Sequence, residues 1–157
     1  GLVGPKLLNP DKSIQSSVYK FPSLAGAFKE YWLDQKGSFE KYYPKSKTPV
    51  VVDAVVGAVM LIPRRTLQKV GEFDEKFFMY FEDLDYCRRV RLEGLKVYYL
   101  PKAELIHYHG ASGKTISQKT QKWLVESSKK YHGWIKYWVI TLVIWTGQKL
   151  QKILYEK

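Results

Sequence analysis

Three carboxylates within four positions are the residues of this sequence best suited to acid–base chemistry. Glu82, Asp83 and Asp85 directly follow the aromatic and apolar run 77–81. Burial against apolar side chains raises the pKa of a carboxyl group, and a shifted pKa is what a general acid or base uses. A structural role is also open, because an acidic first turn complements its own helix dipole and Asp85 can pair with Arg89 one turn later.

A second group of possible ligands is the segment His107-Tyr108-His109. A carboxylate together with an imidazole suits a divalent metal or a general base. The segments between the two groups have helix and strand patterns, so the chain could bring Asp83 and His107 to one edge of a sheet. A metal hydrolase that uses these two residues ranks last among the functions considered, because the sequence has no two-histidine helix motif.

Periodicity and turn residues predict the elements that position these groups. The expected strands are 3–8, 13–19, 96–100 and 104–107, and the expected helices are 24–33, 64–70, 82–93 and 117–132. The apolar stripe of the first helix, Leu24, Ala27, Phe28, Tyr31 and Trp32, is expected to pack in the core or as a lid.

The segment 50–62 is the most hydrophobic part of the first two thirds of the chain and predicts buried strands. Gly57 and Ala58 lack bulk, so another backbone or a ligand can come close there. Asp53 lies inside this apolar run and needs a partner. It is expected either to form hydrogen bonds at a strand edge or to belong to the site.

The charge of the chain is concentrated near its end. The 157 residues carry a formal net charge of +11, and residues 114–157 contribute nine lysines against two glutamates, a net of +7. Such a segment attracts phosphate groups of nucleic acid, nucleotides or anionic lipids. The single cysteine, Cys87, excludes an internal disulfide.

Within this basic segment, residues 134–145 are too short an apolar run to span a bilayer, which takes about 20 residues. Tryptophans at both ends and flanking lysines favour a helix that lies in the membrane interface. A C-terminal helix packed on the domain or on a partner is the alternative.

The sequence resembles the C-terminal half of family 2 glycosyltransferases, most closely the rhamnosyltransferase-like branch that builds bacterial cell-surface polysaccharides. The resemblance rests on residues 56–65 (VGAVMLIPRR), 70–89 (VGEFDEKFFMYFEDLDYCRR) and 107–112 (HYHGAS), with Gly94, Pro101 and the opening segment 4–11 (GPKLLNPD). It implies an α/β fold, a partial Rossmann-like GT-A sandwich over residues 1–113, followed by a basic helical tail over 114–157.

The resemblance also implies roles for single residues. Asp83 would be the base that takes the proton from the acceptor hydroxyl during an inverting transfer, with Glu82 and Asp85 holding or tuning it. His107 would lie near the metal and the leaving diphosphate. The predicted substrate-binding residues are Gly57, Ala58, Asp53, Phe81 and Arg88.

The departure from the family is the nucleotide-binding half, with its Asp-x-Asp motif, for which this sequence has no counterpart. We therefore expect an incomplete form, whether a truncated protein, a fragment or a split gene product, that turns over poorly alone. A separate donor-binding half is one candidate partner. A divalent metal, Mg²⁺ or Mn²⁺, is expected only in the complete enzyme. The expected partners are a nucleoside-diphosphate sugar, with rhamnose as a candidate sugar, and a glycan or lipid-linked acceptor.

The expected location is the cytoplasm, at the anionic inner face of the cell membrane. The alternative function is a non-catalytic basic module that docks on anionic membrane or nucleic acid through residues 114–157. Nucleic acid is the less favoured target, because the aromatic residues of this segment cluster in one apolar helix instead of alternating with lysines.

Overall fold

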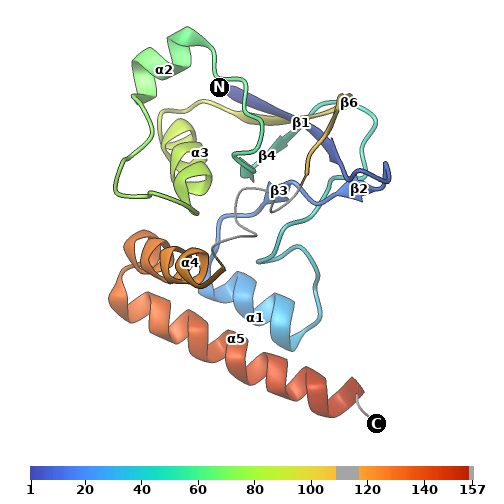
Figure 1. Cartoon of the computed structure of the whole chain (residues 1–157), viewed down its shortest axis with the longest axis vertical. Helices are drawn as coiled ribbons and strands as arrows, with labels where there is room; N and C mark the ends of the chain where they lie inside the picture. The colour runs from blue at the N-terminus through green and yellow to red at the C-terminus, as the bar shows by residue number, and fades with distance from the viewer. Residues whose placement is uncertain (109–116, 156–157) are drawn as a thin grey trace.

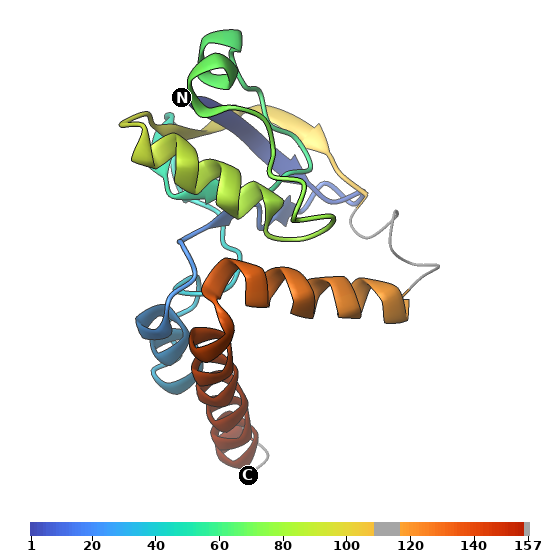
Figure 2. The same ribbon diagram turned by 90° about the vertical axis from the view of Figure 1, so that its left-hand side faces the viewer.

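The computed structural model describes residues 1–108 and 117–155, and Figures 1 and 2 show them as a mixed α/β arrangement. The strands are β1 (Leu2–Leu8), β2 (Ile14–Gln15), β3 (Val18–Tyr19), β4 (Val50–Val52), β5 (Ala54–Val55) and β6 (Val97–Ile106). The helices are α1 (Leu24–Trp32), α2 (Arg64–Val70), α3 (Glu82–Leu92), α4 (Ser117–His132) and α5 (Trp134–Tyr155). The predicted α/β class is confirmed.

The strands form two sheets. The larger has the order β2-β1-β6-β4, in which β1 and β6 run parallel and both outer strands run antiparallel to their neighbours. The smaller pairs β3 with β5. Parallel strands need a long connection between them, and here the chain between β1 and β6 contains α1, α2 and α3.

Four strand predictions are wrong in detail. The expected returning strand 13–19 divides into β2 and β3, which belong to different sheets. The segment 50–62 forms only β4 and β5, which part at Asp53, and its remainder is irregular apart from a bridge between Leu61 and Val3. The two strands expected over 96–107 are one, β6, because a bulge at Pro101 replaces the expected turn and shifts the pairing with β1.

The helix predictions agree with the structure more closely. Helix α2 has the predicted bounds, and Gly71 and Gly94 have positive φ angles of 84° and 73° where α2 and α3 end. Such angles favour glycine, which has no Cβ to clash. Helix α5 extends ten residues beyond the expected end at residue 145, to Tyr155. Among the described residues, no helix is long and apolar enough to cross a membrane.

The core lies between the sheets and α3. Its fully buried side chains include Leu2, Val55, Val90 and Tyr99. The face of α3 that carries Leu84 and Cys87 packs against it, so the buried side of this helix fixes the position of its acidic first turn. Burial of such side chains stabilises the fold by about 1.5–3 kcal/mol each.

Helices α1, α4 and α5 form a second group, on the other side of α3 from α2 (Figure 2). Helices α1 and α5 lie side by side, and α4 crosses between them and α3. Gly147 lets α5 approach α1, because a Cβ at this position would lie 2.7 Å from Cβ of Tyr31. The predicted boundary between residues 113 and 114 falls outside the described residues, and the division into a domain and a tail stays a prediction.

Glu30 of α1 fixes the loop that follows this helix. Its side chain is buried, and Oε2 accepts the backbone N–H groups of Ser38 at 2.7 Å and Phe39 at 3.0 Å. A charged acceptor forms stronger hydrogen bonds than a neutral one. Glu30 therefore holds residues 38–41 against α1.

Replacement of Glu30 by alanine is expected to lower the free energy of unfolding by roughly 3 kcal/mol, because two buried amides lose a charged acceptor. Denaturation in urea measures this change. Glu126→Ala is the matched control, since Glu126 is exposed on α4 with only a 3.9 Å contact to Lys122. Similar losses in both variants would contradict the anchoring role of Glu30.

Candidate active site

A cavity of about 530 Å³ lies where the acidic turn of α3 faces α1 and α4. Five aromatic side chains line it, together with Glu82, Asp83, Lys41 and Leu124; the aromatic residues are Tyr19, Tyr31, Phe39, Tyr80 and Phe81. The volume is in the range of small-molecule sites, which combine apolar walls with a few polar groups. The predicted pair Glu82 and Asp83 therefore lies in a concave, aromatic site.

Asp83 is held by backbone donors from two segments. Its Oδ2 accepts the N–H of Gly57 at 2.9 Å, and its Oδ1 accepts the N–H of Leu84 at 2.7 Å. A Cβ at Gly57 would lie 3.4 Å from Cβ of Asp83, which is ordinary van der Waals contact. The structure thus places Gly57 beside the acidic turn of α3, and its substrate-binding role stays a prediction.

Two carboxyl groups of the cavity, those of Glu82 and Asp83, have raised pKa values. Burial is the main cause for Asp83, and the hydrogen bonds from Gly57 and Leu84 and the charge of Lys41 act in the opposite direction. Burial also raises the pKa of Glu82, and the negative charge of Asp83 adds to this. Among the described residues, the buried Oε2 of Glu82 has no hydrogen-bond partner. The pair can accept protons, which is the requirement for a general base.

The backbone immediately before α3 is strained. Tyr80 and Phe81 both have φ angles of 67°, in the left-handed region that bulky residues rarely adopt. Each such residue costs about 1–3 kcal/mol, so the surrounding contacts must stabilise the conformation.

Helix α4 supplies several of these contacts. Ser127 Oγ donates to the carbonyl of Met79 at 2.8 Å, and the Phe81 ring packs on Tyr131 with 5.2 Å between centroids. Lys130 Nζ donates to the carbonyl of Lys76 at 2.8 Å. Helix α4 therefore holds the strained turn that presents Asp83 to the cavity.

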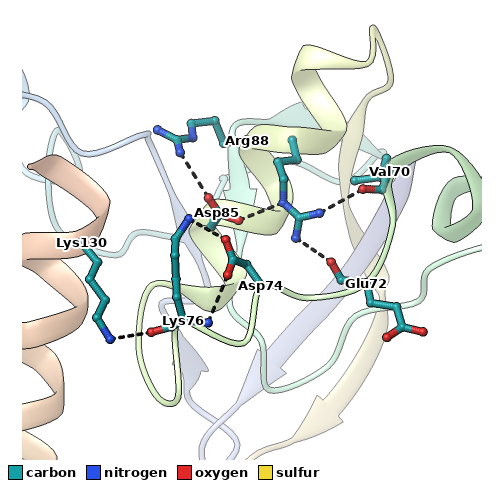
Figure 3. A network of polar contacts seen from close by, with 8 residues as sticks. Val70, Glu72, Asp74, Lys76, Asp85, Arg88 and Lys130 are labelled. Atoms are coloured by element: carbon teal, nitrogen blue, oxygen red, sulfur yellow. Dashed lines mark hydrogen bonds and ion pairs between the residues drawn. The ribbon is translucent and has the colours of Figure 1, made fainter.

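Asp85 has different partners from Asp83. Its buried carboxylate accepts Arg89 Nε at 2.9 Å and Arg88 Nη2 at 3.2 Å (Figure 3). Arg89 also donates to the carbonyl groups of Val70 and Glu72, which connects α3 to the end of α2. The pairing of Asp85 with Arg89 that the sequence allows is present, and Asp85 does not line the cavity.

The other predicted binding residues lie in different places. Phe81 lines the cavity, whereas Ala58 is exposed beside Gly57. Arg88 pairs with Asp85 and lies 4.7 Å over the Tyr131 ring. Asp53 accepts the N–H of Phe21 at 3.3 Å and lies 3.7 Å from Arg91. The substrate-binding roles of Ala58, Arg88 and Asp53 stay predictions.

His107 lies at the end of β6, where its Nδ1 is 2.7 Å from Oε1 of Gln15. Within residues 1–108 and 117–155, no three His, Cys, Asp or Glu side chains gather closely enough to hold a metal ion. The described side chains thus do not supply a metal site by themselves, and His109 lies outside them. The role of His107 near a metal stays a prediction.

Several cavity residues were not found by the sequence reasoning. Tyr19, Tyr31 and Lys41 come from β3, α1 and the loop 34–48, which have no motif that points to a site. Long-range packing brings them to α3. The aromatic run 77–81 was the one local pattern that pointed to an aromatic wall beside the carboxylates. Tyr80 and Phe81 of that run line the cavity.

The sequence is similar to those of known glycosyltransferases. A family model described as "Glycosyltransferase like family 2" matches residues 45–126. Rhamnosyltransferase WbbL of Escherichia coli K12 is 32% identical over 117 residues, which are 73% of this chain and 43% of that protein. No solved structure matches the chain significantly.

Two more distant relatives also carry glycosyltransferase names. The N-acetylglucosaminyl-diphospho-decaprenol L-rhamnosyltransferase of Mycobacterium tuberculosis H37Rv is 30% identical over 121 residues, 71% of this chain and 38% of that protein. The low-salt glycan biosynthesis hexosyltransferase Agl10 of Haloferax volcanii is 25% identical over 115 residues, 68% of this chain and 37% of that protein. The chain thus spans about two fifths of the length of these curated relatives.

Replacement of Asp85 by asparagine is expected to lower the free energy of unfolding by roughly 3 kcal/mol, because it leaves Arg89 without its buried counter-charge. Asp74→Asn is the matched control, since Asp74 forms an exposed pair with Lys76 and such pairs contribute about 0–1 kcal/mol. Urea denaturation of both variants measures the difference. Equal losses would contradict a structural role for the Asp85 network.

Replacement of Asp83 by asparagine is expected to lower the pKa of Glu82, because it removes the charge that opposes ionisation of Glu82. The pKa should stay above the ordinary glutamate value, since burial is the larger cause. NMR titration of the side-chain carboxyl carbons measures it. An unchanged pKa, or one at the ordinary value, would contradict this assignment.

The same raised pKa values affect stability. A carboxyl group whose pKa is raised on folding stabilises the folded state below its unfolded pKa, and this contribution is lost as pH rises through the folded pKa. The contribution of Glu82 and Asp83 should therefore decrease as pH rises above the ordinary carboxyl range.

Proposed function

Because this chain belongs to the family 2 glycosyltransferases, as a rhamnosyltransferase-like member, we propose that it forms the acceptor side of a sugar transfer with Asp83 as the general base. The observation that carries the proposal is the position of Asp83 in an aromatic cavity, where burial raises its pKa and two backbone amides fix its carboxylate.

In this mechanism the acceptor hydroxyl lies in the cavity beside Asp83. Its oxygen attacks the anomeric carbon of the donor sugar while the Asp83 carboxylate takes the hydroxyl proton. The bond from the anomeric carbon to the diphosphate oxygen breaks, the nucleoside diphosphate leaves with the electron pair, and the configuration inverts. A positioned base of this kind contributes about 10²–10⁴ to a rate.

The aromatic walls suit a sugar acceptor, because sugar rings have apolar C–H faces that pack on aromatic rings while their hydroxyl groups reach the polar residues. Lys41 is the one cation among the described residues that line the cavity. It faces Asp83 closely enough to affect its pKa, and can also attract a phosphate of the acceptor. The hydroxyl of Tyr31 donates to Glu40, which orients both groups at the cavity rim.

The donor is proposed to be a nucleoside-diphosphate sugar, with rhamnose the sugar that the names of two relatives favour. The name of one relative also specifies a sugar carried on a polyprenyl diphosphate. We propose the same class of acceptor for the present chain, a sugar carried on a lipid diphosphate. A divalent metal on the donor side remains part of the proposal, and no step above passes through it.

Replacement of Asp83 by asparagine is expected to reduce sugar transfer by about 10²–10⁴, because the acceptor hydroxyl loses its base. The assay follows labelled sugar from a nucleoside diphosphate to a lipid extract, with a donor-binding half supplied in trans. Glu126→Gln on the exposed face of α4 is the control. Asp83→Asn with transfer equal to that of the control would show that the base assignment is wrong.

A further inference from the structure

Helix α5 presents a wide apolar stripe that no described part of the chain covers. Six of its large side chains, Trp134, Ile135, Trp138, Val139, Leu142 and Trp145, are 41–74% exposed. They are spaced one, three or four positions apart and therefore share one side of the helix. Ile140 and Gly147 on the other side are buried, and Gly147 contacts α1.

Helix α1 continues this stripe. Leu24, Phe28 and Trp32 recur every four residues and are 39–44% exposed. Leu24 lies in a shallow groove with Trp134, Ile135 and Val139 of α5. Further along, Trp32 Nε1 donates to the carbonyl of Val143 at 3.1 Å, and Phe28 stacks on Trp32. We call this two-helix surface the α1–α5 face.

The exposed charged side chains on the described parts of these two helices are all lysines. Lys29, Lys136, Lys149 and Lys152 are exposed, and Lys149 Nζ lies 3.9 Å over the Trp145 ring. The one carboxylate of α1, Glu30, is buried and turned towards the loop 38–41, and the described part of α5 has none. Tryptophan and lysine around an apolar stripe are the composition of a helix that lies in a lipid interface.

The face has a fixed relation to the cavity because α1 contributes to both. Tyr31 of α1 lines the cavity, while Leu24, Phe28 and Trp32 of the same helix lie on the α1–α5 face. A helix with its side chains is about 10–12 Å across. A lipid surface under α1 and α5 would therefore lie about one helix diameter from the cavity, within reach of a sugar on a membrane-embedded diphosphate.

We propose that the α1–α5 face docks on the surface of an anionic bilayer and thereby holds the cavity at the level of a lipid-linked acceptor. The choice of lipid follows from the lysines and the absence of exposed carboxylates on the described part of these helices. The link to the acceptor rests on the proposed function, whereas docking itself does not.

The test is co-sedimentation of the chain with vesicles of phosphatidylcholine that contain phosphatidylglycerol, compared with phosphatidylcholine alone. Stronger binding to the anionic vesicles, weakened by salt, is expected. Lys136→Gln and Lys149→Gln should each weaken it about fivefold. No binding to anionic vesicles, or equal binding to both kinds, would overturn the proposal.

Matched variants test which surface is used. The triple variant Trp134→Ala, Ile135→Ala, Leu142→Ala and the double variant Leu24→Ala, Phe28→Ala are each expected to weaken binding about tenfold or more. The control triple Leu61→Ala, Leu92→Ala, Ile106→Ala removes side chains that are also 49–79% exposed but lie on other elements. Circular dichroism and thermal unfolding establish that each variant is folded.

An equal loss in the control triple would overturn the proposal, and normal binding by the α1 double variant would overturn the two-helix face. Asp83→Asn should bind vesicles as the unchanged chain does. If the chain did not bind anionic vesicles but still transferred sugar to a water-soluble acceptor, the membrane-docking proposal alone would be wrong. Normal docking combined with full transfer by Asp83→Asn would count against the proposed function alone.

Discussion

The site depends on one interaction, the pair of backbone hydrogen bonds that hold the buried carboxylate of Asp83. Gly57 donates from the irregular segment after β5, and Leu84 donates from the first turn of α3. Both bonds favour the charged form, whereas burial favours the neutral form, and burial has the larger effect. The result is a carboxylate in a fixed position that retains a high affinity for a proton. These are the two properties that a base for a hydroxyl group needs.

Two of the three acidic residues in the first turn of α3, Asp83 and Asp85, have different partners because they point in different directions. Successive α-helical side chains are 100° apart, so Asp83 and Asp85 point to nearly opposite sides. Asp83 faces the cavity, and Asp85 pairs with two arginines that join α3 to the end of α2. The strained backbone at Tyr80 and Phe81 lies directly before this acidic turn. Contacts from α4 stabilise that strain, so part of the predicted tail supports the site.

Features of the fold that depend on nearby residues could be predicted from the sequence, whereas features that depend on long-range packing could not. Helix α3 and its stop at Gly94 could be predicted because the acidic turn, the apolar spacing and the glycine all act within a few residues. The division of β4 from β5 at Asp53 could not, because it depends on which sheet each half joins. Tyr19, Tyr31 and Lys41 reach the cavity from three separate segments for the same reason. The resemblance to a family singled out Asp83 as the candidate base. The residues of the cavity around it could be found only from the structure.

Helix α1 illustrates a different limit of sequence patterns. Periodicity identifies an apolar stripe, but the same stripe forms whether protein or lipid covers it. Leu24, Phe28 and Trp32 belong to a stripe expected to pack in the core or as a lid, and they are 39–44% exposed, whereas Ala27 of the same stripe is fully buried. The buried side of α1 carries Glu30, which holds the loop of Phe39 and Lys41 at the cavity. One short helix thus carries both the exposed apolar side chains and a buried carboxylate that fixes part of the cavity wall.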